Sequence, residues 1–369
     1  MNGLHRLQDF LKAENYDASI ILSETNLRYF TGFTGTTAVA FITRTDAYLI
    51  TDSRYRIQAA NQCEGYEVIQ YKDSIWQTIK ELINDSGTPI ATCIIEGDSM
   101  PVDTYKKMSE ALTDIKEFKS VNLATVRAVK REDELELMRY AAKIADEAFA
   151  AMLKQLKVGM TENEARIILE KEMMDRGSEE PSFKTIVASG IRSNMPHGVA
   201  SDKVIEDGDF VTFDFGSVYK GYHSDMTRTI VMGTASEFQK FLYNTILESQ
   251  MNGVKAVKAG ITGRDLDEAC RANFKAREDL KDLVYQHGTG HGVGLDIHEE
   301  PVASPKSDTV LEPNMIITVE PGIYLEGCHA IDKFNDGDCG LRIEDTVIVT
   351  DNGCEIITHT TKELIEVKG

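Results

Sequence analysis

The sequence predicts an α/β domain at the N-terminus followed by an α+β domain at the C-terminus. A chain of 369 residues is longer than one hydrophobic core usually supports, so two domains are expected. Residues 1–125 alternate amphipathic helical stretches with short apolar runs, a pattern typical of helices packed on a mixed sheet. In residues 126–369, long helical stretches alternate with strand hairpins without regular βαβ repeats, which indicates an α+β arrangement.

The elements expected in the first domain follow from the spacing of its apolar side chains. The opening residues interleave charged with apolar side chains, which predicts an amphipathic helix and not a signal peptide. Strands are expected at 18–22, 38–42, 47–51, 67–71 and 91–96, and helices at 53–61, 75–84 and 102–112.

The pattern changes around residues 121–131, where we place the domain boundary. A long helix is then expected from Asp133 to Leu156. Thr161-Glu-Asn-Glu164 matches a capping box, in which the threonine and glutamate side chains satisfy free backbone amides at a helix start. Thr234-Ala-Ser-Glu237 matches a second box and predicts a helix that runs to about Val257.

Composition excludes several classes of partner. The formal net charge of −20 argues against nucleic acid, because phosphate binding requires a basic face. No apolar run reaches the length of a membrane span. The six cysteines show no Cys-x-x-Cys spacing and are expected to be reduced, mostly buried thiols. These features predict a cytoplasmic enzyme with neither a membrane nor a nucleic-acid partner.

Asp214 and Asp225 lie on two strands of a predicted hairpin that turns near Tyr219 to Gly221. A turn centred between Tyr219 and Lys220 places the aspartates directly opposite each other, with Cβ atoms about 5 Å apart on one face. A turn at Lys220-Gly221 suits glycine at positive φ but needs a bulge to keep that pairing. Carboxylates this close repel each other unless cations lie between them.

An imidazole comes from the segment His287-Gly-Thr-Gly-His-Gly-Val-Gly294. Its glycines allow the backbone to approach a site closely, and His291 at the centre can offer a ring nitrogen to a metal ion. A phosphate-binding loop is the alternative, but the segment lacks both the Rossmann order of glycines and a P-loop lysine.

Glu320 and Glu344 each follow a short apolar run that predicts a strand. A glutamate buried at such a position requires compensation, and metal coordination supplies it. Arg342 stands two residues before Glu344, so on a strand it points to the same face and can hold a ligand carboxylate in place. Four carboxylates and one imidazole suit two divalent ions such as Mn²⁺, with Co²⁺ and Zn²⁺ as alternatives.

These motifs resemble those of the pita-bread metallopeptidases, the family of methionine aminopeptidase, aminopeptidase P and prolidase. All five ligand positions match the family pattern. Residues 1–125 are similar to the creatinase-like N-terminal domain of the proline-specific members, and 126–369 to the pita-bread catalytic domain. Val126-Arg-Ala-Val-Lys130 with Glu134 resembles the joint between those domains.

The resemblance implies that Asp214 binds one ion, that Asp225 and Glu344 bridge both ions, and that His291 and Glu320 complete the second. A hydroxide bridging the two ions would be the nucleophile.

The resemblance also assigns residues that contact the substrate. His197, in Asn194-Met-Pro-His-Gly198, and His298 match histidines that bind the substrate carbonyl and stabilise the tetrahedral intermediate, and Glu320 counts with them as catalytic. Further substrate-binding positions that match are His287, found in the proline-specific members, with Tyr324 and Arg342, implicated in relays around the ligands.

The function implied is a homodimeric exopeptidase that cleaves the bond before a penultimate proline in peptides or dipeptides. Thr51-Asp-Ser-Arg-Tyr55 with Gln58-Ala59 is similar to a motif of short bacterial aminopeptidase P proteins, which favours an Xaa-Pro aminopeptidase. An Xaa-Pro dipeptidase is the alternative, and a non-catalytic binding protein of the same fold is a further one.

Two features depart from the family pattern. His223 occupies a variable position just before Ser224-Asp225, and we expect it to be exposed. The stretch 325–340 is longer than the corresponding link in many relatives and predicts a surface loop, with a lid or crevice wall as the alternative.

Overall fold

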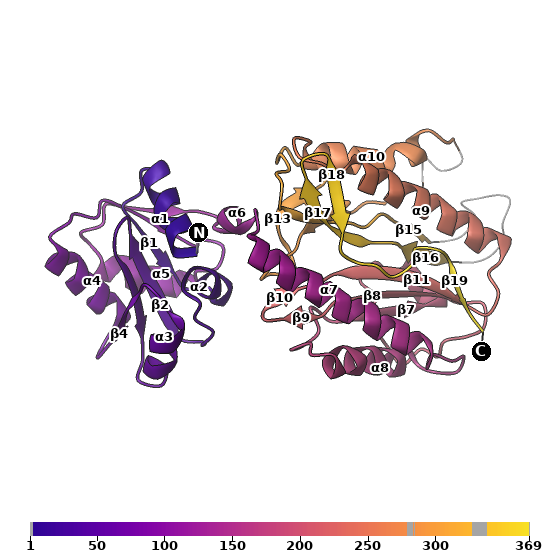
Figure 1. Ribbon diagram of the computed structural model, residues 1–369, viewed down its shortest axis with the longest axis horizontal. Helices are drawn as coiled ribbons and strands as arrows, with labels where there is room; N and C mark the ends of the chain where they lie inside the picture. The colour runs from indigo at the N-terminus through magenta and orange to yellow at the C-terminus, as the bar shows by residue number, and fades with distance from the viewer. Residues whose placement is uncertain (1–2, 279–282, 284, 327–337, 369) are drawn as a thin grey trace. The chain divides into compact units, whose positions relative to one another are not determined.

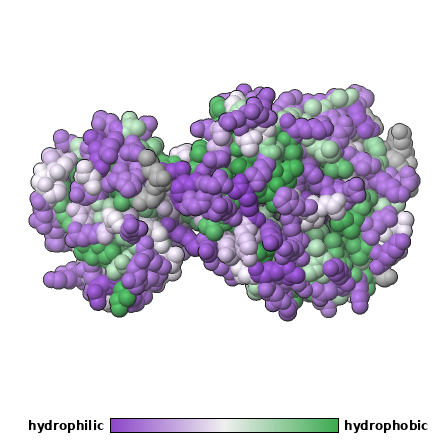
Figure 2. Space-filling model, viewed as in Figure 1, coloured by the Kyte–Doolittle hydropathy of each residue, from purple (hydrophilic) through white to green (hydrophobic). Residues whose placement is uncertain are grey.

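The computed structural model describes residues 3–278, 283, 285–326 and 338–368, and the chain divides into two compact units, Met1–Arg127 and Ala128–Gly369 (Figure 1). The division lies two residues beyond position 125, where the first domain was expected to end. On the face shown in Figure 2, hydrophilic residues dominate the surface of each unit, in keeping with the net charge of −20. None of the described helices combines the length and the apolar character that crossing a lipid bilayer requires.

The first unit is built on a six-stranded sheet in the order β4-β3-β2-β1-β5-β6. The β1–β2 and β2–β3 pairs are antiparallel and the others parallel, so the sheet is mixed, as expected. The strands are β1 (Ala18–Ile21), β2 (Ala38–Thr43), β3 (Ala47–Thr51), β4 (Glu67–Gln70), β5 (Thr92–Ile95) and β6 (Glu117–Ser120). The helices are α1 (Gly3–Ala13), α2 (Glu24–Thr31), α3 (Arg56–Gln62), α4 (Ile75–Ser86), α5 (Val102–Ala111) and α6 (Ala124–Arg127).

The sequence pattern does not predict β6, α2 or α6. Strand β6 is an edge strand with three of its four side chains exposed, so it lacks the apolar run by which buried strands are recognised. The core of the first unit consists of side chains from both layers, such as Ile20 and Phe41 from the sheet and Ile79 and Met108 from the helices.

The second unit places two helix pairs on either side of its strands (Figure 1). The helices are α7 (Glu132–Leu153), α8 (Glu162–Asp175), α9 (Glu237–Ala256) and α10 (Gly263–Lys275), with the 3₁₀ helix η1 (Gly190–Asn194). The strands are β7 (Ile186–Ser189), β8 (Phe210–Phe215), β9 (Val218–Tyr219), β10 (Tyr222–His223), β11 (Met226–Met232), β12 (Gly290–Gly292), β13 (Glu299–Ala303), β14 (Ile316–Val319), β15 (Gly322–Leu325), β16 (Cys339–Arg342), β17 (Asp345–Thr350), β18 (Gly353–Ile356) and β19 (Ile365–Val367).

Two cores hold these layers together. Helices α7 and α8 pack on the sheet β19-β11-β8-β7, with Phe149 and Leu169 against Phe213. Helices α9 and α10 pack on the sheet β14-β17-β18, with Tyr243 and Leu266 in one buried cluster with Ile317. The strands that carry the predicted ligands therefore lie between two apolar layers.

The helix starts confirm one capping box and correct the other. Thr161 caps α8 and Glu164 completes the box, as predicted. The second box uses Ser236 and Gln239 instead of Thr234 and Glu237, so α9 begins two residues later than expected. Ser236 and Gln239 satisfy each other's backbone amides at 2.9 and 3.1 Å, which meets the same requirement with a serine–glutamine pair.

Candidate metal centre

The five predicted ligands converge on one cavity of about 420 Å³ in the second unit. Its lining includes Asp214, Asp225, His291, Glu320 and Glu344, and also His197, His287, His298 and Arg342. Tyr324 lies behind this lining, with its hydroxyl 2.8 Å from Arg342 Nη1. Residues far apart in the sequence are thus brought to one pocket by three different strand pairs.

The hairpin that carries the two aspartates has a different register from the direct pairing considered above. It turns at Lys220-Gly221, where both residues have positive φ, 48° and 77°, as two-residue hairpin turns prefer. Asp214 on β8 consequently lies opposite Thr227 on β11, so the predicted pairing with Asp225 is wrong. Asp225 precedes β11 and still reaches the same cavity.

His291 lies on β12, where glycines are required by close backbone contacts. A Cβ atom on Gly290 would lie 1.9 Å from the carbonyl oxygen of Thr318. The Nδ1 atom of His291 is 3.0 Å from the carbonyl oxygen of Gly292, a contact that assigns the proton to Nδ1. Its Nε2 atom therefore presents a lone pair, 3.5 Å from Asp225 Oδ2 and 3.5 Å from Glu320 Oε1.

The carboxylates are buried in a way that costs free energy without a cation. Burial and the charge of Glu344 raise the pKa of Asp225 well above its ordinary value, and burial raises the pKa of Glu344 well above its own. Burial, with the charge of Asp214 in addition, raises the pKa of Glu320 to about 8. Carboxyl groups with pKa values raised in this way bind protons or other cations more readily than exposed carboxylates do.

The donor atoms fit divalent cations. One ligand atom from each of Asp225, His291 and Glu344 lies within 4.8 Å of the other two. Three buried carboxylate oxygens, Asp214 Oδ1, Asp225 Oδ1 and Glu344 Oε1, accept no hydrogen bond within the described part of the chain. Oxygen-rich sites of this kind suit hard divalent ions, and buried oxygens without donors are the atoms that such ions would satisfy.

Arg342 holds several parts of the site together. Its Nη2 atom donates to Asp214 Oδ2 at 2.6 Å, and its Nη1 atom donates to the Tyr324 hydroxyl at 2.8 Å and to the Pro196 carbonyl at 3.1 Å. Its Nε atom donates to the hydroxyl of Thr227 at 3.0 Å. Thr227 in turn donates to Glu344 Oε2 at 2.7 Å, so one guanidinium orients two carboxylates. No local sequence pattern marks Thr227, because its role depends on lying opposite Asp214.

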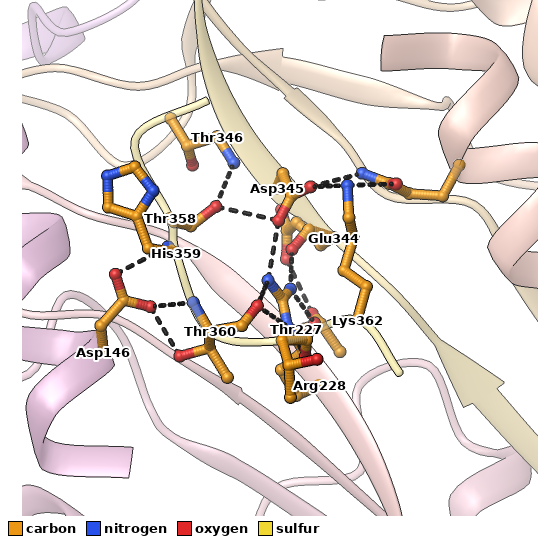
Figure 3. Close-up of polar contacts among 12 residues, drawn as sticks. Asp146, Thr227, Arg228, Glu344, Asp345, Thr346, Thr358, His359, Thr360 and Lys362 are labelled. Carbon is orange, nitrogen blue, oxygen red and sulfur yellow. Dashed lines mark hydrogen bonds and ion pairs between the residues drawn. The ribbon is translucent and has the colours of Figure 1, made fainter. Parts of the chain in front are cut away.

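A buried polar network lies directly behind Glu344 (Figure 3). The Asp345 carboxylate accepts hydrogen bonds from Arg228 at 2.8 Å, from Lys362 at 2.6 Å and from Thr358 at 3.0 Å. Arg228 also donates to the backbone carbonyl of Glu344. Burial favours the protonated form of Asp345, but Arg228 and Lys362 outweigh it and lower the pKa. The network therefore fixes the backbone from which Glu344 projects.

The predicted substrate histidines surround the carboxylates. The His298 ring lies 4.3 Å from that of His291, and burial lowers the pKa of His298. Burial lowers the pKa of His287 to about 4, and its ring lies 5.7 Å from that of Tyr324. With a pKa of about 4, His287 is neutral near pH 7. His197 follows η1 on a segment that begins at Ser189 and ends at Ser201, and the backbone amides of both serines donate to the buried Glu162 carboxylate.

The features that departed from the family pattern differ in outcome. His223 is half-buried, not exposed as expected, because it follows the hairpin turn and packs inside the unit, and it does not line the cavity. Burial lowers its pKa. Residues 327–337 of the stretch 325–340 lie outside the described part of the chain. The surface loop predicted there, and the lid or crevice wall given as the alternative, therefore stay predictions. The five described cysteines are free thiols.

Comparisons with known proteins identify a family for each of the two units. Residues 136–351 match metallopeptidase family M24, and residues 4–129 match the creatinase/prolidase N-terminal domain. The chain is 37% identical to an Xaa-Pro dipeptidase of Pyrococcus furiosus, over 98% of this chain and 99% of that protein.

Two solved structures have the same architecture. An Xaa-Pro dipeptidase from Bacillus anthracis is 41% identical with a TM-score of 0.91, covering 99% of both chains. An X-Pro aminopeptidase from Thermotoga maritima is 36% identical with a TM-score of 0.86, covering 96% of this chain and 98% of that one. The chain therefore belongs to metallopeptidase family M24 and is a peptidase with a creatinase-type N-terminal domain and a pita-bread catalytic domain.

Proposed function

We propose that this protein is an Xaa-Pro dipeptidase that uses two divalent metal ions to hydrolyse the bond before proline. The observation that carries the proposal is the convergence of four carboxylates and His291 on one cavity beside three further histidines. The sequence motifs favoured an Xaa-Pro aminopeptidase. Relatives named as Xaa-Pro dipeptidases, 37% and 41% identical over nearly the whole chain, shift the preference to the alternative.

The ligand set we propose is the one that the resemblance implies. Asp214 would bind one ion, Asp225 and Glu344 would bridge both, and His291 with Glu320 would complete the second. The buried oxygens of Asp214, Asp225 and Glu344 without hydrogen-bond donors support this assignment. When bound, such ions acidify a water molecule and polarise the scissile carbonyl. Mn²⁺ suits the oxygen-rich donors, and Co²⁺ or Zn²⁺ are the alternatives.

The remaining residues position the substrate. His197 and His298 would donate N–H groups to the scissile carbonyl oxygen and stabilise the charge that develops on it. His287 stays neutral near pH 7, since its pKa is about 4. Its Nδ1 donates to the Gly288 carbonyl at 2.7 Å, so its Nε2 can accept one hydrogen bond from the substrate. Arg342 would act on the substrate through Asp214, which it orients, and Tyr324 would act through its hydrogen bond with Arg342. The apolar side chains of Ile186, Val199 and Ile297 line the same cavity and suit a pyrrolidine ring.

Substrate length is the decisive test. Purified protein loaded with Mn²⁺ is offered the dipeptide Ala-Pro and the tripeptide Ala-Pro-Ala, and release of alanine is followed. The proposal requires kcat/KM for the dipeptide to exceed that for the tripeptide by at least about tenfold, a difference of about 1.4 kcal/mol in transition-state binding. Equal or faster cleavage of the tripeptide identifies an aminopeptidase instead. Failure on both substrates rejects proline specificity.

The cytoplasmic location and the homodimer remain predictions. Light scattering of the purified protein measures the molar mass against the 41.1 kDa chain. Cell fractionation with an antibody to the protein tests the location. A monomer in solution, or the protein in the membrane fraction, contradicts the corresponding prediction.

A further inference from the structure

One lysine faces the catalytic cavity without a role in holding the carboxylates. Lys184 lies two residues before Ile186, and Ile186 pairs with Asp214 in the β7–β8 register. Alternate residues of an extended segment share a face, which agrees with the presence of both Lys184 and Ile186 in the cavity lining. Lys184 is exposed, so its ammonium group is open to an incoming ligand.

The cavity lining contains two permanently cationic side chains, Lys184 and Arg342, among the described residues. Arg342 is occupied by Asp214, Tyr324, Thr227 and the Pro196 carbonyl. Lys184 makes no hydrogen bond or ion pair with another residue in the described part of the chain. Lys184 is therefore the lining cation that is available to bind an anion.

The neighbours of Lys184 match the rest of a prolyl group. Phe183 precedes it, and Phe183, Ile186, Val199 and Ile297 contribute apolar side chains to the cavity. A pyrrolidine ring packed on these side chains is favoured because it leaves water. Its carboxylate needs a cationic partner in the same cavity, and Lys184 is next to Phe183 in that lining.

We propose that Lys184 binds the C-terminal carboxylate of the Xaa-Pro dipeptide and thereby selects substrates that end at proline. This inference rests on the proposed dipeptidase function and adds the residue that sets substrate length. In a longer peptide the corresponding carbonyl is an amide, which carries no charge for the ammonium group to attract.

The test compares the carboxylate with its neutral analogue. Mn²⁺-loaded wild type, Lys184→Met, Lys184→Arg and Lys157→Met are assayed on Ala-Pro and on Ala-Pro-amide. Lys157 is an exposed lysine of the same unit that does not line the cavity, so its replacement controls for the change in net charge. Lys184→Met removes the proposed charge-assisted hydrogen bond, and it is expected to lower kcat/KM for Ala-Pro by about tenfold, mainly through KM. This is the low end for such bonds, because Lys184 is exposed.

The same substitution is expected to change kcat/KM for Ala-Pro-amide by less than about twofold, and Lys184→Arg should retain most of the wild-type value on Ala-Pro. Added NaCl should raise KM for Ala-Pro in the wild type more than in Lys184→Met, because salt screens an exposed ion pair. Circular dichroism and metal content check that each variant is folded and loaded.

The outcomes separate the two proposals. Suppose that the wild type cleaves Ala-Pro, and that Lys184→Met lowers kcat/KM equally for Ala-Pro and Ala-Pro-amide or changes it for neither. The proposed role of Lys184 is then wrong, while the dipeptidase function stands. A tenfold loss shared by Lys157→Met also overturns it, because the effect would then follow from net charge. If the wild type cleaves no Xaa-Pro substrate, the proposed function fails and the inference falls with it.

Discussion

The guanidinium of Arg342 donates a hydrogen bond of 2.6 Å to the Asp214 carboxylate, although 128 residues separate the two in the sequence. Arg342 is buried, and its side chain also contacts Thr227, which orients Glu344. The contact has two consequences. It neutralises part of the charge of the acidic cluster, and it leaves the second Asp214 oxygen free to bind a metal ion.

Arg342→Lys tests this arrangement. Lysine keeps the positive charge but cannot donate to Asp214, Tyr324 and Thr227 at once, because its ammonium is a single point and not a planar fork. We expect kcat to fall by about 10- to 100-fold and metal affinity to weaken, as replacement of groups that orient metal ligands usually produces. Activity and metal titrations of the two proteins measure both effects.

Arg139→Lys is the matched control, since Arg139 pairs with Glu355 at an exposed position away from the cavity. Wild-type kcat in Arg342→Lys, or equal losses in both variants, would show that Arg342 does not orient the ligands.

Asp225→Asn tests the bridging role. The change removes one charge from the cluster while preserving the shape of the side chain. We expect metal content to fall from two ions per chain to one or fewer, and activity to fall by at least about 100-fold, more than for groups that only orient ligands. Inductively coupled plasma mass spectrometry and an Ala-Pro assay measure these quantities. Full activity with two bound ions would refute the role.

The metal-free protein should become less stable as pH rises. Burial raises the pKa of Glu320 from 4.5 to about 8, and burial raises those of Asp225 and Glu344 in the same direction. Between these pH values the folded state keeps a proton that the unfolded chain has released, so the free energy of unfolding falls as pH increases. The contribution of Glu320 to the free energy of unfolding is therefore largest below about pH 4.5, and it is lost as pH rises to about 8.

Urea denaturation of chelator-treated protein at about pH 6 and about pH 8 measures the effect. The midpoint should be lower at about pH 8, and saturating Mn²⁺ should remove the difference because the ions replace the protons. A midpoint that is unchanged or higher at the more alkaline pH in the metal-free protein contradicts the expectation.

Asp345→Ala tests the network behind Glu344. The substitution leaves Arg228 and Lys362 without their shared carboxylate, and Arg228 is almost fully buried. Removing one partner of a buried ion pair costs about 3–5 kcal/mol, so a loss of that size in the free energy of unfolding is expected.

Glu355→Ala breaks the exposed pair with Arg139 and provides the comparison, with an expected cost below about 1 kcal/mol. Urea denaturation of both variants measures the two costs. Similar losses in the two variants would show that the buried network around Asp345 stabilises the fold no more than the exposed Arg139–Glu355 pair does.

The sequence by itself predicted a metal site and most of the elements that carry its residues. Local apolar spacing predicts most helices and strands of the first unit, and Thr161 with Glu164 marks the start of α8 because a capping box depends on four consecutive residues. The five predicted ligands could be named from three local patterns: acids on a hairpin, a histidine in a glycine-rich segment and glutamates at the ends of apolar strands. Local residues also mark candidate turns, but they left two registers open for the hairpin.

The tertiary structure alone decided the hairpin register and the contacts across it. Asp214 lies opposite Thr227 because the chain turns at Lys220-Gly221, and a shift of two residues changes every pair along the strands. The contact of Arg342 with Asp214 and the place of Lys184 at the cavity depend on packing between distant segments. Such contacts follow from how layers meet, whereas a sequence pattern reports only the spacing along one element.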